Sequence, residues 1–267
     1  MTATRLEAIF TKTRAENRAA LITYIMAYAP DYETSLATMN GLPDAGADII
    51  ELGLPFSDPM ADGPIIQNAA QLALKAGAKL RLVLDMVKEF RKRNNTTPVI
   101  LMGYCNPLQN YGFTEFCNDA EDAGVDGLLI VDVPIEEEHD LKTAAMRADI
   151  CWIRLIAPTT SEERIKTIVK SATGFVYYVA VAGVTGTKSA SAISIEKAVA
   201  TIKEYTSLPI AVGFGIKSPQ DVNIVAQSAD GVVVGSSIVK DMLDKCDSNP
   251  TLILVNKLAS GLSKVKK

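Results

Sequence analysis

Residues 48–64 read DIIELGLPFSDPMADGP, and this stretch predicts how the chain is built. Ile49 and Ile50 are typical of a buried strand, which ends on the carboxylate Glu51. A polar, turn-forming segment then leads to a second carboxylate, Asp62, before a helical pattern begins. Because two acids on a strand end and its loop can face one pocket, the stretch predicts acid–base chemistry that needs no cofactor.

The same short apolar pattern recurs along the chain and predicts a parallel barrel. Each run is rich in Val, Ile and Leu without alternation, as strands buried on both faces are, and a helical pattern follows it. The spacing of roughly 30 residues is that of a βα unit. We therefore expect a single-domain (β/α)8 TIM barrel over residues 1–267 with an extra N-terminal helix; a doubly wound sheet or two smaller domains are the alternatives. The eight predicted strands are residues 20–27, 48–53, 98–102, 127–133, 151–157, 175–182, 209–213 and 231–234.

Helix signals support this alternation. An amphipathic helix is expected at the start of the chain, with Leu6 and Phe10 on its apolar face. Ser218 before Pro219 predicts a capped helix start, and Thr160 predicts another, with Glu163 as the acid three residues later. Glycines 46, 77, 124 and 174 lie where helices would end.

Composition narrows the class of protein. The net charge of -4, with 27 basic and 31 acidic residues interspersed, gives no footprint for nucleic acid or a membrane surface. The N-terminus has no apolar signal-peptide centre, and the four cysteines show no CxxC spacing, so we expect a cytoplasmic protein with reduced thiols. The single histidine, His139, argues against a histidine-rich metal site.

Glycines at the ends of the last two predicted strands indicate a phosphate site. Gly213-Phe214-Gly215 closes the seventh strand, and Gly235-Ser236 closes the eighth and opens the final helix. Barrels often bind phosphate here, where glycine lets the main chain approach an anion closely. The alternative is that these glycines only form turns.

Two connections are longer than the roughly 2 to 6 residues usual after a strand, and are candidate lids. One runs from Glu51 to about residue 65, and the other from residue 183 to about residue 194. The second can equally be a solvated flexible loop.

The motif ELGLPFSDPMADGPIIQ, followed in order by GVTG, GFGI and GSSIV, resembles the alpha subunits of tryptophan synthase over essentially the whole chain. This resemblance implies cleavage of indole-3-glycerol phosphate to indole and glyceraldehyde 3-phosphate. It also implies no cofactor in this chain and a partner beta subunit, in an alpha2-beta2 complex, that holds pyridoxal phosphate and receives the indole.

The resemblance also assigns residues. Glu51 and Asp62 match the two catalytic acids, Glu51 for the proton transfers and Asp62, ionised, as acceptor of the indole N–H. Asp58 falls in the loop that faces the partner. The substrate-binding candidates are Tyr24 and Phe214 near the indole, Tyr177 beside the acids, Tyr104, Thr185 in the mobile loop, and Gly186, Gly215, Gly235 and Ser236 at the phosphate.

The sequence is also compatible with other functions and other roles for these residues. Tyr28-Ala29-Pro30 stands where relatives usually carry Gly-Asp-Pro, which leaves room for a largely inactive allosteric partner subunit. Another phosphate-binding barrel, such as a sugar-phosphate isomerase or epimerase, is disfavoured. A metal epimerase would want several histidines, and a triosephosphate-type isomerase wants a His and a late Glu at strand ends, which this chain lacks. Tyr104 and Tyr177 can also simply fill the barrel, and Asp132 can be a third pocket acid or can position a loop.

Overall fold

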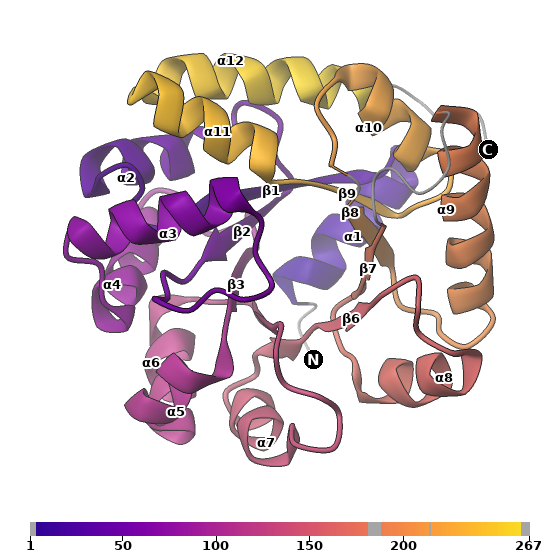
Figure 1. Ribbon diagram of the computed structural model, residues 1–267, viewed down its shortest axis with the longest axis horizontal. Coiled ribbons are helices and arrows are strands. Elements are labelled where there is room, and N and C mark those ends of the chain that lie inside the picture. Colours follow the sequence, from indigo (N-terminus) through magenta and orange to yellow (C-terminus); the bar gives the residue numbers. More distant parts are fainter. Residues whose placement is uncertain (1–3, 181–187, 214, 263–267) are drawn as a thin grey trace.

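The computed structural model describes residues 4–180, 188–213 and 215–262, and its strands form one parallel sheet (Figure 1). The nine described strands follow the order β5-β4-β3-β2-β1-β9-β8-β7-β6. Their bounds are β1 Ala20–Met26, β2 Ile49–Gly53, β3 Val99–Gly103, β4 Gly127–Ile130, β5 Cys151–Trp152, β6 Arg154–Ile156, β7 Val176–Val179, β8 Ile210–Gly213 and β9 Gly231–Val234.

The two edges of this sheet are neighbours in the chain, and this closes it into the predicted TIM barrel. The predicted strand 151–157 is divided at Ile153: β5 pairs with β4, and β6 pairs with β7. The Ile153 N–H donates to the Leu128 carbonyl at 2.9 Å, which holds the division against β4. The barrel prediction is therefore confirmed and the doubly wound alternative is wrong, while the fifth predicted strand is corrected to two short ones.

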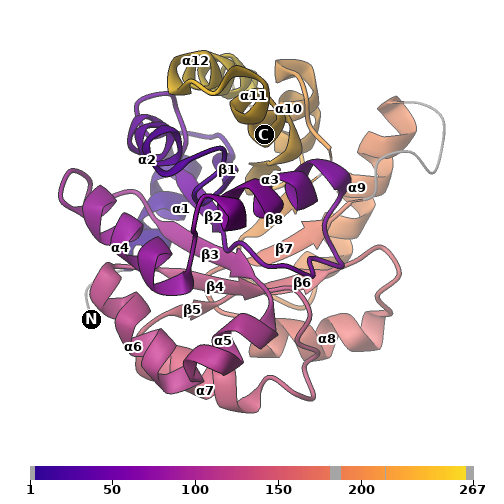
Figure 2. The same ribbon diagram turned by 60° about the vertical axis from the view of Figure 1, so that its left-hand side comes forward.

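Helices surround the strands (Figure 1), and Figure 2 shows the same arrangement turned by 60°. The chain places two described helices, not the expected one, after each of β2, β3 and β9. No helix in the described part is long and apolar enough to cross a membrane. The helices are α1 Arg5–Ala15, α2 Tyr32–Gly41, α3 Pro64–Lys75, α4 Leu80–Arg91, α5 Cys105–Tyr111, α6 Phe113–Ala123, α7 His139–Arg147, α8 Glu162–Ser171, α9 Lys188–Lys203, α10 Pro219–Ala226, α11 Ser236–Lys245 and α12 Ser248–Ala259, before the short η1 Ser260–Leu262.

Two helix starts test the capping predictions. Ser218 caps α10 as predicted, its hydroxyl accepting the Asp221 N–H at 3.2 Å. The predicted cap at Thr160 is wrong, because the Thr160 hydroxyl accepts the Ala157 N–H at 3.0 Å within the preceding turn. Ser161 caps α8 instead.

The loop predicted from residue 183 to about residue 194 ends earlier than expected. Helix α9 begins at Lys188, not near residue 194. Residues 183–187 of that loop lie outside the described part of the chain.

The barrel interior is apolar at one end and polar at the other. Helix α1 closes the N-terminal end, where Leu6 and Phe10 pack against inward-facing strand residues such as Ile22 and Ile49. Side chains two positions further along β1 and β2 share that face, because successive strand residues alternate. The next inward layer therefore includes Tyr24 and Glu51.

Candidate active site

Glu51 is the central acid of the polar layer. Strand β2 places it beside Tyr24 of β1, its register partner, with only 2% of its surface exposed. Its Oε1 has no hydrogen-bond partner among the described residues. Burial, reinforced by the charge of Asp62, raises the pKa of Glu51 from 4.5 to about 8. A carboxyl group with this pKa holds a proton at neutral pH and can both give and take it.

Asp62 approaches Glu51 from the loop between β2 and α3. Tyr104, the cap residue of α5, holds this loop: its hydroxyl accepts the Ala61 N–H at 3.1 Å and also bonds the Asp62 carboxylate. Burial raises the pKa of Asp62, and the bond from Tyr104 opposes that rise. Asp62 has the more favourable surroundings for a negative charge, so the two acids are suited to different roles.

Two tyrosines stand beside the acids and stay neutral. Burial raises the pKa of Tyr24 and of Tyr177 well above the usual value, and nearby carboxylates add to the effect. Each hydroxyl lies over a glycine: a Cβ added at Gly53 would come within 2.2 Å of the Tyr24 oxygen, and one at Gly213 within 2.5 Å of the Tyr177 oxygen. Glycine at the two strand ends leaves the space that these phenols occupy.

A cavity of about 290 Å³ extends from the acids to the ends of β8 and β9. At that far end Gly215 has a φ of +59°, a left-handed conformation that favours glycine. Gly235 precedes α11, and Ser236 is its first residue, so N–H groups of the first helical turn are available to an anion. The Ser237 hydroxyl donates to the Ile216 carbonyl at 2.9 Å and ties the two strand ends together.

The structure brings most of the predicted site residues together at this cavity. Its wall includes Tyr24, Glu51, Asp62, Tyr177, Gly215, Gly235 and Ser236, and Tyr104 adjoins it through Asp62. The predicted Thr185, Gly186 and Phe214 lie outside the described residues. Across the described ranges no cluster of three or more His, Cys, Asp or Glu side chains could hold a metal ion.

Two further acids, Asp132 and Asp58, make local contacts outside the cavity wall. Asp132 accepts the Cys105 N–H at 2.9 Å, so it positions the start of α5, one of the two roles left open for it. Asp58 is exposed and accepts the hydroxyl of the adjacent Ser57.

Lys217 also lines the cavity, although it was not among the site residues predicted from the sequence. Its place two residues after the Gly213-Phe214-Gly215 turn was the available signal.

The turn after β1 has Tyr28-Ala29-Pro30 in place of the Gly-Asp-Pro usual in relatives, and its own contacts hold it in place. Tyr28 takes the left-handed conformation, with a φ of +66°. Its N–H donates to the Ser35 hydroxyl at 3.1 Å, and its ring packs on Tyr32 with centroids 5.1 Å apart. Packing by these residues holds a backbone conformation that glycine would adopt without strain.

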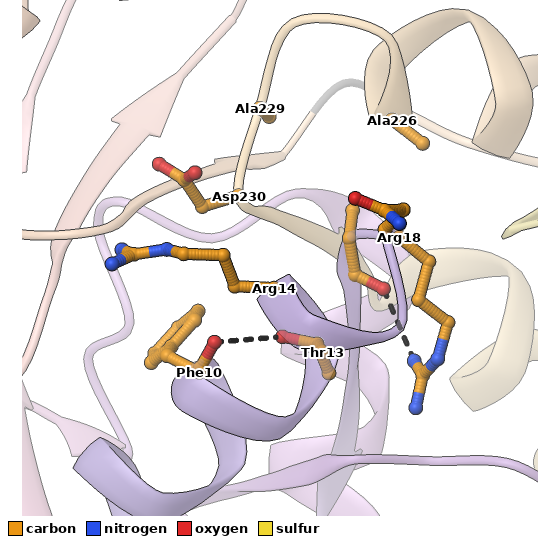
Figure 3. Close-up of a pocket in the computed structure, with 9 residues that line it drawn as sticks. Phe10, Thr13, Arg14, Arg18, Ala226, Ala229 and Asp230 are labelled. Carbon is orange, nitrogen blue, oxygen red and sulfur yellow. Dashed lines mark hydrogen bonds between the residues drawn. The ribbon is translucent and has the colours of Figure 1, made fainter. Parts of the chain in front are cut away.

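A second pocket lies at the opposite end of the barrel (Figure 3). Arg14 of α1 and Arg18, just after the end of that helix, lie on different sides of the pocket, and Asp230 lies near Arg14 in this view. The pocket measures about 60 Å³, and Asp230 already pairs with Lys203 at 3.0 Å. It is too small for a substrate larger than a few atoms. The cavity above Glu51 is the candidate active site because its wall brings together two acids whose pKa values are raised.

Fold and cavity together define a class: a (β/α)8 barrel with two carboxyl groups and a glycine-flanked helix start at the C-terminal ends of its strands, where barrel enzymes have their active sites. A family model described as "Tryptophan synthase alpha chain" matches residues 10–265. The chain belongs to the family of tryptophan synthase alpha chains, lyases of tryptophan biosynthesis, and the resemblance carried by the motifs is confirmed.

Individual relatives agree over nearly the full length. Tryptophan synthase alpha chains from Gluconobacter oxydans (strain 621H) and Phenylobacterium zucineum (strain HLK1) are 51% and 53% identical over 238 and 249 residues. These alignments cover 89% and 93% of this chain, and 88% and 90% of the relatives.

Solved structures show the same barrel. The tryptophan synthase alpha chain of Legionella pneumophila subsp. pneumophila is 34% identical, with a TM-score of 0.90 over 100% of both chains. An open form of tryptophan synthase from M. tuberculosis is 34% identical, with a TM-score of 0.88 over 97% of this chain and 99% of that one.

Proposed function

We propose that this chain cleaves indole-3-glycerol phosphate to indole and glyceraldehyde 3-phosphate by a retro-aldol reaction. One observation carries the proposal. Glu51 is buried, one of its oxygens has no partner in the described structure, and its pKa is raised to about 8 next to a second acid. A buried acid without a structural partner is costly for the fold and points to chemistry.

The two acids divide the reaction between them. Protonated Glu51 gives its proton to the indole carbon that carries the glycerol chain, and Asp62 accepts the indole N–H and stabilises the positive charge that develops on the ring. The carbon–carbon bond then breaks, and its electrons restore the aromatic ring. Glu51, now ionised, takes the proton of the glycerol hydroxyl whose carbon becomes the aldehyde.

The remaining walls position the two ends of the substrate. We assign the phosphate to Gly215, Gly235 and Ser236, where the first turn of α11 supplies N–H donors. Tyr24 and Tyr177 flank the carboxylates and give the indole a surface that is aromatic yet uncharged. For Thr185, Gly186 and Phe214, contact with the substrate stays a prediction.

The assembly is part of the proposal. Because the relatives are parts of tryptophan synthase, we infer a beta subunit as partner, in an alpha2-beta2 complex, with pyridoxal phosphate only in the beta subunit. We assign the exposed loop with Asp58 to the partner-facing side, residues 1–267 to one domain, and the chain to the cytoplasm.

The test is indole release from indole-3-glycerol phosphate, with and without a tryptophan synthase beta subunit. Glu51→Gln and Asp62→Asn keep the side-chain shapes but remove the proton carrier and the charge, so each should lower kcat at least a hundredfold. Glu121→Gln, an exposed change on α6, is the matched control. Full activity of Glu51→Gln would refute the assignment. Substrate binding without turnover in the unmodified chain would instead favour the allosteric-subunit alternative.

A further inference from the structure

The proposed active-site cavity carries its charges unevenly. Glu51 and Asp62 lie at one end, whereas Lys217 is the single cationic side chain among the described residues that line the wall. Lys217 belongs to the same far end as Gly215 and Ser236. The cavity is therefore acidic where the chemistry is proposed and basic where the phosphate is assigned.

The backbone of Lys217 is held in place from two sides. Its N–H donates to Asp221 Oδ2, in the first turn of α10, at 3.2 Å. The carbonyl of the preceding Ile216 accepts the Ser237 hydroxyl from α11. These bonds fix the origin of the lysine side chain beside the start of α11, while its exposed, flexible stem lets the ammonium group turn toward a ligand.

A positive charge at this site would strengthen the binding of a phosphate ester. Backbone N–H groups and the dipole of α11 provide only about half a positive charge between them. The substrate would bring close to two negative charges into a cavity that already holds two acids, on a chain with a net charge of -4. A compact lysine ammonium offsets this repulsion without requiring fixed bidentate geometry.

We propose that Lys217 is the counter-ion of the substrate's phosphate group and a binding residue of this site. The assignment rests on the proposed cleavage of a phosphate ester. It gives Lys217 no part in proton transfer, so its effect belongs to KM and to phosphate affinity, and kcat should stay within about twofold.

The test compares Lys217→Gln and Lys217→Arg with Lys257→Gln, which removes the same charge from an exposed position on α12. KM and kcat for indole release are measured with the beta subunit present, and binding of inorganic phosphate to the same proteins is measured by calorimetry. Lys217→Gln should raise both KM and the phosphate Kd about fivefold at low salt, as expected for a partly exposed ion pair. Near 1 M salt the difference should nearly vanish, because the screening length there is about 3 Å. Lys217→Arg should retain most of the affinity.

The outcomes separate this inference from the proposed function. Unchanged KM and phosphate Kd in Lys217→Gln would overturn the role of Lys217 while leaving the cleavage reaction standing. Phosphate binding that depends on Lys217, in a chain that releases no indole even with the partner, would support the counter-ion and overturn the lyase assignment. An equal loss in Lys257→Gln would show a general charge effect and would also overturn the role of Lys217.

Discussion

The buried acid at the centre of the site should make the fold less stable as the pH rises. Glu51 has a pKa of about 8 in the folded chain and 4.5 as the ordinary value. Below pH 4.5 both folded and unfolded states hold its proton. Between these two values the unfolded chain loses the proton and the folded chain keeps it, so the free energy of unfolding falls with increasing pH. Above about pH 8 Glu51 is ionised in both states, and the full cost of burying its charge lowers the free energy of unfolding.

The magnitude follows from the two pKa values. Each pH unit between them is worth about 1.36 kcal/mol, which gives an upper limit of about 5 kcal/mol for the whole interval. Because relaxation of the folded chain around the carboxylate lowers this penalty, we expect about 2 to 5 kcal/mol. Glu51→Gln has no proton to lose, so the variant should gain that much stability over the unmodified chain between pH 5 and pH 9.

Urea unfolding at five pH values across this range measures the difference directly. Each curve is compared with that of Glu121→Gln, which changes a carboxylate on the exposed face of α6 and should follow the unmodified chain. All other titrating groups are common to the three proteins, so only the difference between curves matters. Parallel curves for Glu51→Gln and the unmodified chain would refute the raised pKa and with it the resting proton on Glu51.

Four other outcomes are expected. Tyr104→Phe removes the hydroxyl that holds Ala61 and Asp62, and kcat/KM for indole release should fall about tenfold, whereas Tyr178→Phe, in the outer core, should leave it unchanged. Gly53→Ala would drive a Cβ into the Tyr24 hydroxyl, so calorimetry should show a loss of about 1 to 3 kcal/mol along with reduced turnover; normal stability would mean that Tyr24 moves freely. The buried Arg91 guanidinium lies 2.7 Å from the Asp126 carboxylate, and Asp126→Ala removes this charged partner. Denaturant unfolding should show a loss of about 3 to 5 kcal/mol. Lys92→Ala, which breaks an exposed ion pair, should cost less than about 1 kcal/mol. The pH profile of kcat/KM should be bell-shaped, falling on the alkaline side near pH 8 as Glu51 loses its proton and on the acid side as Asp62 gains one; a flat profile to pH 10 would contradict the role of Glu51.

The barrel was predictable because its strands are buried on both faces and therefore have an unmistakable composition. The division at Ile153 was not, since residues 151–157 are apolar except for Arg154 and contain no Gly or Pro that would mark a break. It results from barrel closure, in which the first half of the run pairs with β4 and the second with β7. Pairing between distant segments is a tertiary effect that local composition does not record. The cap at Ser161 was missed for a similar reason, because two adjacent hydroxyl residues compete and the turn at Ala157 takes Thr160.

In the candidate site, too, residues within one motif could be predicted together, whereas residues joined only by the fold could not. The run from Glu51 to Asp62 lies within one unbroken motif, so the two acids could be named together. That Tyr104 holds the Asp62 loop depends on β3 ending beside β2, and that Lys217 shares a cavity wall with Ser236 depends on β8 ending beside β9. Strand order had to be known before either residue could be connected with the acids.

The structure also explains why two similar carboxyl groups can act differently in one cavity. Glu51 is fixed on a strand, within a layer of the barrel that water reaches poorly, and its protonated form is favoured. Asp62 comes from a loop, is less buried, and receives a phenol hydrogen bond that favours its charged form. The negative charge of Asp62 in turn raises the pKa of Glu51, so the stabiliser of the proposed cationic intermediate also keeps the proton donor loaded. Exchanging the two residues would place the aspartate on the strand and the glutamate on the loop, but the strand position would still favour the protonated acid. The roles therefore belong to the positions that the barrel creates more than to the side chains that occupy them.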